Sequence, residues 1–253
     1  MGRRFTKSAA AVALPMFEAE AAGLAALRTT GTVRVPEVIS CGLVENQARI
    51  DLEYLDLRGL DRTSGAMLGR QLADLHRHTG ERFGFESDNW IGGSPQENGW
   101  RDNWALFYAE RRLRPQLRRA RDNGMERSLA QQGESLAERV SAFFLDYHPP
   151  PSLLHGDLWG GNASALADGT PVIFDPATYY GDRETDVAMT ELFGGFPESF
   201  YAAYRAAWPL DPGYETRKTL YNLYHVLNHF NLFGAGYLGQ ARRMIEKLLA
   251  ELR

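Results

Sequence analysis

The 253-residue sequence contains one cysteine, Cys41, and only three lysines among its 28 basic residues, Lys7, Lys218 and Lys247. A single cysteine excludes a disulfide framework and a thiolate-rich metal site, and it is typical of a reducing compartment. The 32 acidic residues outnumber the basic ones, and the net charge is −4. No overall positive field therefore favours nucleic acid or an anionic membrane surface as a partner.

The sequence also lacks an apolar run near the roughly 20 residues that a membrane helix needs. Its basic start, residues 2–7, and the apolar residues 9–14 imitate a signal peptide, but Glu18 and Glu20 follow at once and the apolar residues continue at helical spacing. We therefore expect a cytoplasmic protein that does not bind membranes. The hydrophobic content of 44% is enough for one large core or for two small domains that share a cleft.

Apolar spacing predicts an α+β chain with strands in the first 60 residues and in one later hairpin, a short apolar run over 152–154, and helices over most of the remainder. A strand over 4–7, an amphipathic helix beginning at Leu14, and two strands over 33–41 and 48–57 are expected first. Asp168-Gly169 predicts a hairpin that joins 163–166 to 171–174. The remaining apolar patterns predict helices over 64–78, 101–122, 128–147, 185–193, 197–207, 213–234 and 237–252.

Two charged residues near the start of the chain can explain each other. Glu20 lies on the apolar stripe of the first predicted helix, where an unpaired carboxylate would be costly. Lys7 lies at the end of the preceding strand. An ion pair between them would satisfy both residues, whereas a solvated terminal lysine and a half-buried acid are the alternatives.

The segment His155-Gly156-Asp157, followed by Asn162 and by Asp175 after the hairpin, has the layout of a kinase-type phosphoryl-transfer site. Such a reaction needs a carboxylate that accepts the proton of the attacking hydroxyl, and Asp157 fits this role. It also needs magnesium on the phosphates, and magnesium prefers oxygen ligands. Asn162 and Asp175 supply one neutral and one charged oxygen from opposite sides of the hairpin.

Other histidines invite a metal interpretation that the sequence does not support. His225 and His229 are four residues apart on a predicted helix, but neither an intervening glutamate nor a third ligand is evident. We therefore expect them to pack within the helix. His76 and His78 end another predicted helix, where a solvent-facing or capping role is expected.

Five stretches, residues 16–20, 154–162, 174–177, 180–186 and 220–234, together resemble the fructosamine/ketosamine-3-kinase family. The similarity runs from Lys7 to the carboxyl terminus. It implies a protein-kinase-like bilobal fold with a small β-rich N-lobe, residues 1–57, and a mainly helical C-lobe, residues 58–253. It further implies ATP and Mg²⁺ as co-substrate and cofactor, and phosphorylation of the 3-hydroxyl of a small-molecule or protein-borne ketosamine. A monomer is favoured.

The resemblance assigns roles to individual residues. Asp157 is the base, Asn162 and Asp175 bind metal, and Lys7 with Glu20 forms the clamp on the phosphates. His155 and Asp186 support the catalytic loop. Adenine is expected along the segment Glu53, Tyr54 and Leu55, for which a plain buried strand is the alternative. The substrate positions are Asp88, Asn89, Trp90 and Trp159, although Trp159 packed beneath the catalytic loop is an alternative.

The sequence departs from the kinase pattern at its start, because no Gly-rich turn precedes Lys7 and Gly2 alone cannot form one. We therefore expect a truncated N-lobe in which the lysine strand forms a sheet edge and nucleotide affinity is reduced. A non-catalytic, ketosamine-binding pseudokinase is one alternative function. A kinase of the aminoglycoside or choline type, which differs only in its acceptor, is another.

Overall fold

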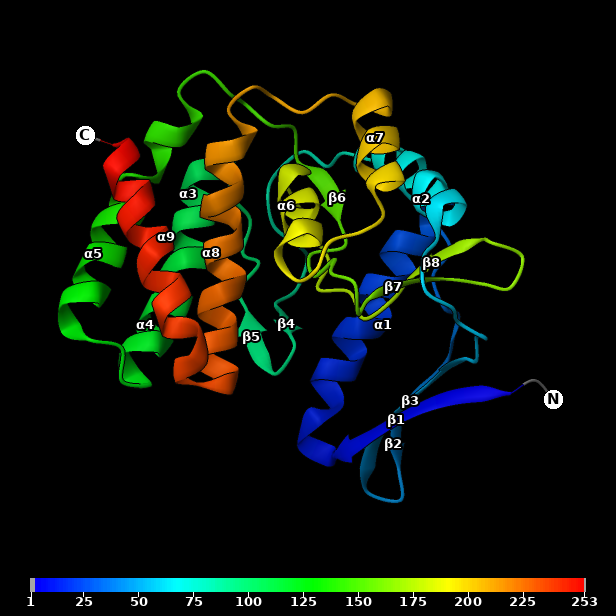
Figure 1. Cartoon of the computed structure of the whole chain (residues 1–253). Helices are drawn as coiled ribbons and strands as arrows, with labels where there is room; N and C mark the ends of the chain where they lie inside the picture. Colours follow the sequence, from blue (N-terminus) through cyan, green and yellow to red (C-terminus); the bar gives the residue numbers. More distant parts are fainter. Residues whose placement is uncertain (1–2, 253) are drawn as a thin grey trace.

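The computed structural model describes residues 3–252, so the expectation for Gly2 lies outside the described residues. A small antiparallel sheet and one helix form one part of the molecule, and helices and short hairpins form the larger part (Figure 1). The chain is thus α+β, as predicted. Among residues 3–252, no helix is both long and apolar enough to cross a membrane.

The small sheet contains β1 (Arg4–Ala10), β2 (Val38–Val44) and β3 (Gln47–Glu53) in the order β1-β3-β2. Both pairings are antiparallel, and Lys7 on the edge strand β1 lies opposite Ile50. The turn between β2 and β3 uses Glu45 and Asn46, both with positive φ, as a tight two-residue hairpin requires. Lys7 therefore lies on the outer strand of the sheet, as expected.

Helix α1 (Leu14–Thr29) packs on this sheet, and its residues explain both its start and its buried face. A 3₁₀ turn (Ala11–Ala13) leads into it, and Pro15 occupies the first turn, where its missing N–H costs nothing. Leu24 and Leu27 are buried against Ile50 and its neighbours in the core. Glu20, on the same helix, lies beside the sheet edge that carries Lys7.

The larger part contains the remaining elements, among them the hairpin β7–β8 and the strand pair β6–β9. Helices α2 and α7 pack together, and α8 lies between α6 and α9 (Figure 1). The helices are α2 (Arg62–His76), α3 (Trp104–Tyr108), α4 (Arg114–Asp122), α5 (Arg127–Glu138), α6 (Glu184–Leu192), α7 (Glu198–Ala207), α8 (Tyr214–Phe233) and α9 (Leu238–Glu251). The strands are β4 (Asn89–Ile91), β5 (Ser94–Gln96), β6 (Ser152–Leu154), β7 (Ala163–Ala165), β8 (Pro171–Ile173) and β9 (Tyr179–Gly181).

The helix predicted over 101–122 is interrupted, because residues Ala109–Leu113 form a π-helical turn between α3 and α4. Pro115 has no N–H to donate to the carbonyl of Arg111, four residues earlier. The guanidinium of Arg112 donates to that carbonyl instead, at 2.9 Å. The buried Arg112 side chain also donates to Asn98, so the wide turn ties this helix to the loop before it.

Two further boundaries differ from the prediction. The helix predicted over 128–147 ends at Glu138, and a 3₁₀ turn (Val140–Phe144) follows in which Val140 and Phe144 are buried. The predicted strands 33–41 and 48–57 are shifted and shorter, since β2 begins at Val38. Arg34 instead forms an isolated bridge with Val172 of the hairpin β7–β8, which connects the small sheet to the larger part.

Candidate active site

Strand β6 leads into residues 155–162, the segment predicted to be catalytic and called the catalytic loop below, which begins with a sharp backbone turn at His155-Gly156-Asp157. Gly156 has a φ of +85°, and a Cβ at this position would lie 2.1 Å from the carbonyl oxygen of Ala177, so only glycine fits. His155 is buried, and its Nε2 lies 2.9 Å from the carbonyl oxygen of Phe174. The loop is thus held against the segment that carries Asp175.

Asp186, at the start of α6, holds the catalytic loop from behind. Its carboxylate accepts hydrogen bonds from the backbone N–H groups of His155, at 2.7 Å, and Gly156, at 2.8 Å. Burial acts to raise the pKa of Asp186, but bonds from His76 and from the backbone outweigh it and lower the pKa. The supporting role of His155 and Asp186 stays a prediction, and these hydrogen bonds are the contacts through which Asp186 would exert it.

The expectation of a solvent-facing or capping role is wrong for His76. His76 is fully buried at the end of α2, with Nε2 3.2 Å from Asp186 and Nδ1 2.8 Å from the hydroxyl of Tyr204 on α7. The chain Tyr204–His76–Asp186 therefore connects α7 to the catalytic loop. The only sequence signal was a histidine on the apolar face of α2, which is also typical of a core residue.

The side chain of Asp157, in the catalytic loop, is 18% exposed. Burial raises the pKa of this carboxyl, and the negative charges of Asp186 and Asp175 raise it further, to about 7. Asn162 opposes the shift, because its Nδ2 donates to Oδ2 of Asp157 at 3.3 Å. A carboxylate with a pKa near neutrality is suited to accept a proton at physiological pH.

The hairpin β7–β8 brings Asn162 and Asp175 together. The backbone N–H of Phe174 donates to the carbonyl of Asn162, and Nδ2 of Asn162 lies 3.5 Å from the carbonyl oxygen of Asp175. Among residues 3–252, no donor reaches Oδ1 of Asn162, and the side chain of Asp175 is 45% exposed. A free amide oxygen and an exposed carboxylate match the oxygen ligands that magnesium prefers.

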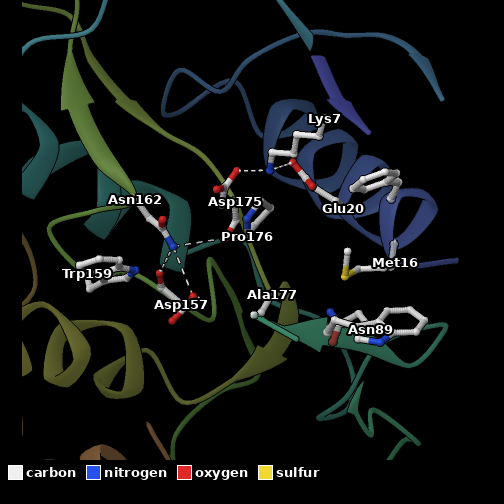
Figure 2. Close-up of a pocket in the computed structure, with 14 residues that line it drawn as sticks. Lys7, Met16, Glu20, Asn89, Asp157, Trp159, Asn162, Asp175, Pro176 and Ala177 are labelled. Atoms are coloured by element: carbon white, nitrogen blue, oxygen red, sulfur yellow. Dashed lines mark hydrogen bonds and ion pairs between the residues drawn. The ribbon is translucent and has the colours of Figure 1, made fainter. Parts of the chain in front are cut away.

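Lys7 and Glu20 form the ion pair that the sequence predicts. Nζ of Lys7 lies 2.8 Å from Glu20 and 2.6 Å from Asp175, so one cation connects the sheet, α1 and the hairpin (Figure 2). Burial acts to lower the pKa of Lys7, but Glu20 and Asp175 outweigh it and raise the pKa. Burial raises the pKa of Glu20 although Lys7 opposes it. Lys7 therefore remains a cation.

One cavity of about 300 Å³ unites these groups (Figure 2). It lies between α1, the turn of β4–β5 and the catalytic loop, and Met16 and Ala177 contribute apolar walls. Trp159 is 39% exposed and lines the cavity, with its ring edge towards Phe193. The predicted site residues that line it are Lys7, Glu20, Asn89, Trp90, Asp157, Trp159, Asn162 and Asp175.

Asp88, which does not line this cavity, and Asn89, which does, both have polar partners within the protein. Asp88 accepts a hydrogen bond from the backbone N–H of Asn98 at 2.7 Å and so shapes the loop before β4. The amide of Asn89 donates to the carbonyl of Thr178 at 2.8 Å and accepts from Gln96 at 2.8 Å. These bonds fix the β4–β5 hairpin at one edge of the cavity.

A second cavity, also of about 300 Å³, lies where the sequence predicts adenine. Phe5, Leu52, Tyr54, Leu55 and Phe174 give it a mostly apolar lining, and Asp175 connects it to the first cavity. Glu53 also lines this cavity, and both oxygens of its carboxylate lie 2.5 Å from Nη2 of Arg34. The apolar slot beside the extended segment 53–55 has the chemistry of a purine site.

Known proteins are similar to this chain in sequence or structure over nearly its whole length. A protein of Synechocystis sp. named "Probable ketoamine kinase" is 48% identical, over 92% of this chain and 79% of its own. The mouse ketosamine-3-kinase is 39% identical, over 98% and 88%. A crystal structure titled "Putative fructosamine-3-kinase", from Haemophilus somnus, has a TM-score of 0.91 at 31% identity, over 98% and 84%.

More distant structures share the fold alone. A choline kinase from Streptococcus pneumoniae has a TM-score of 0.62 at 14% identity, over 98% of this chain and 86% of its own. The fold is therefore that of the protein-kinase-like phosphotransferases, and the chain is a kinase. The family model described as "Fructosamine kinase" matches residues 1–251, and this chain belongs to that family.

Proposed function

We propose that this kinase transfers the γ-phosphate of ATP to the 3-hydroxyl of a ketosamine. One observation carries the proposal: Asp157, the Asn162–Asp175 pair and the Lys7–Glu20 pair line the same cavity. Relatives named for ketoamines and ketosamines support this acceptor class. The apolar slot at Tyr54 and Leu55, which meets the cavity at Asp175, supports adenine binding.

In the proposed reaction, the 3-hydroxyl oxygen forms a bond to the γ-phosphorus while the bond to the β-phosphate oxygen breaks and ADP leaves. Asp157 accepts the hydroxyl proton, for which its pKa of about 7 is suited. Lys7, held by Glu20, offsets negative charge on the phosphates. Magnesium, held through Asn162 and Asp175, would supply further charge neutralisation on the same phosphates.

In this proposal the acceptor binds in the part of the cavity that Trp159 lines, while Trp90 lines the same cavity from β4. An indole face suits the apolar face of a sugar, and it also attracts the cationic amine of a ketosamine. Asp157 lies beside Trp159 in this cavity (Figure 2), so a hydroxyl bound against Trp159 would be near the proposed base. Both a free glycated amino acid and a glycated peptide present this group.

Substitution of the base tests the proposal. Asp157→Asn is expected to lower the turnover of fructosyl-lysine by about 10²- to 10⁴-fold, because the amide cannot accept the proton. Asp168→Asn is the matched control, since Asp168 lies in the β7–β8 turn, where its carboxylate accepts from the backbone N–H of Thr170. Unchanged turnover of the Asp157 variant would contradict the assignment of the base.

Two further measurements separate the alternative functions. Calorimetry with Mg-ATP is expected to show binding in the millimolar range or tighter, and silence would favour a ketosamine-binding pseudokinase. A panel of fructosyl-lysine, a glycated peptide, choline and an aminoglycoside tests the acceptor. Phosphorylation of choline or the aminoglycoside, without phosphorylation of the ketosamines, would contradict the proposed substrate class.

A further inference from the structure

Helix α8 places a buried imidazole behind Asp157 that the roles above leave unused. The side chain of His225 is 5% exposed, and its Nδ1 has no hydrogen-bond partner among residues 3–252. The nearest carboxylate oxygen is Oδ1 of Asp157, at 3.9 Å from Nδ1. Because a buried polar atom without a partner costs free energy, this pairing calls for a physical explanation.

Oδ1 of Asp157, which faces Nδ1 of His225, also lacks a hydrogen-bond partner among residues 3–252. The other carboxylate oxygen, Oδ2, accepts from Asn162 at 3.3 Å. An approach of about 1 Å would bring Nδ1 and Oδ1 to an ordinary hydrogen-bond distance of about 2.9 Å. The terminal torsion of an aspartate is soft enough for this adjustment. Catalytic hydrogen bonds are also commonly long until substrate is bound.

His225 is a neutral group in this environment. Burial lowers its pKa to about 3, and the nearby His229 and Arg112 contribute to the decrease. A neutral imidazole carries one proton, on either Nδ1 or Nε2. With the proton on Nδ1, the ring is a donor that can orient a carboxylate without neutralising its charge.

We propose that His225 is a positioning residue whose Nδ1–H donates to Oδ1 of Asp157. Asn162 holds one oxygen of the carboxylate from the metal-binding hairpin, and His225 holds the other from α8. With both oxygens held, the carboxylate cannot rotate away from the acceptor hydroxyl. This inference rests on the proposed function, because it assumes that Asp157 is the base.

Three substitutions of His225 test the position of the donor. His225→Asn places an amide nitrogen near the site of Nδ1, whereas His225→Gln places it near Nε2, and His225→Leu has no donor. The Gln and Leu variants are expected to lose at least about tenfold in kcat, with the KM for ATP changed by less than about twofold. The Asn variant is expected to keep kcat within about threefold of the wild type.

The outcomes distinguish positioning from packing. The inference is overturned if His225→Leu keeps the wild-type kcat, or if His225→Asn loses as much as His225→Gln. Thermal unfolding of each variant identifies losses that come from instability alone. An active Asp157→Asn enzyme would refute the proposed function, whereas an inactive one together with a fully active His225→Leu enzyme would refute only this inference.

A measurement on the wild-type protein does not depend on whether the variants fold. Nitrogen-15 NMR of the histidine side chains reports which ring nitrogen carries the proton. We expect the proton of His225 on Nδ1. A proton on Nε2 would leave Nδ1 as an acceptor facing a carboxylate and would overturn the inference.

Discussion

Substitution of Gly156 by alanine tests whether the catalytic loop requires a glycine at this position. Alanine substitutions at two other glycines separate the cost of a positive φ from the cost of a steric clash. Gly156 has a φ of +85°, and an added Cβ would lie 2.1 Å from the carbonyl oxygen of Ala177. Gly169, in the β7–β8 turn, has nearly the same φ, +87°, but open space around an added Cβ. Gly160, in the catalytic loop, also has open space and lacks a positive φ.

The expected free-energy changes follow from these differences. A non-glycine residue in the left-handed region costs about 1 kcal/mol, so Gly169→Ala is expected to lose about that amount of stability. Gly156→Ala carries the same cost and a clash, since a carbon normally lies about 3.3 Å or more from a carbonyl oxygen. Such overpacking adds about 1–3 kcal/mol. Gly160→Ala is expected to change stability by less than about 0.5 kcal/mol.

The clash at Gly156 should also lower the turnover rate, because the backbone N–H of Ala177 donates to the carbonyl of His155, in the same loop as Asp157, at 2.9 Å. Relief of the clash must move this pairing and the loop that carries Asp157. We therefore expect Gly156→Ala to lose at least about tenfold in kcat. Urea unfolding and steady-state kinetics on the three alanine variants measure both effects. Equal stability and equal kcat for Gly156→Ala and Gly169→Ala would refute the reasoning.

Three further predictions concern the groups around this loop. Lys7→Met is expected to weaken Mg-ATP binding at least about tenfold in calorimetry. The control is Lys218→Met, which removes an amine paired with Glu191 in the helical part and is expected to leave Mg-ATP binding unchanged. Equal effects of the two substitutions would contradict the phosphate role of Lys7. His76→Phe removes a hydrogen bond to the charged Asp186 and is expected to cost about 2 kcal/mol in urea unfolding, and an unchanged midpoint would show that the bond adds nothing. The pKa of Asp157 is about 7 in the folded protein and 3.8 ordinarily, so folding favours the protonated carboxyl. The resulting contribution to the free energy of unfolding is fully present below about pH 4 and is lost as the pH rises through 7. Without nucleotide or metal, Asp157→Asn should therefore gain stability over the wild type between about pH 4 and 7, by up to about 4 kcal/mol, and a constant difference across that range would contradict the raised pKa.

The sequence was informative where a residue type was out of place. A lysine in a chain that otherwise uses arginine, and a carboxylate on an apolar stripe, predicted the Lys7–Glu20 pair, which the structure confirms at 2.8 Å. The Asp-Gly turn predicted the β7–β8 hairpin, and with it the approach of Asn162 to Asp175. A buried charge needs a partner of opposite charge, and an Asp-Gly turn between two apolar runs favours a hairpin, so both features could be predicted from local sequence.

The sequence was uninformative where a distant partner decides the role of a residue. His76 looks like a helix-end histidine, and only Asp186, 110 positions later, makes it part of the support of the catalytic loop. Helical periodicity also does not predict the π-helical turn before Pro115, where the Arg112 side chain donates to the carbonyl of Arg111. Local sequence does not distinguish a polar loop residue that binds substrate from one that stabilises a hairpin. The amide of Asn89 bonds to Thr178 and Gln96 and so stabilises the β4–β5 hairpin.

The most direct test of the central claim is the identity of the product formed from fructosyl-lysine and Mg-ATP. Phosphorus-31 NMR, correlated with the sugar protons, locates the transferred phosphate on a particular oxygen. We expect phosphate on the 3-oxygen with the wild-type enzyme and with Asp168→Asn, and almost none with Asp157→Asn. Phosphate on another oxygen, or no transfer by the wild-type enzyme, would contradict the account.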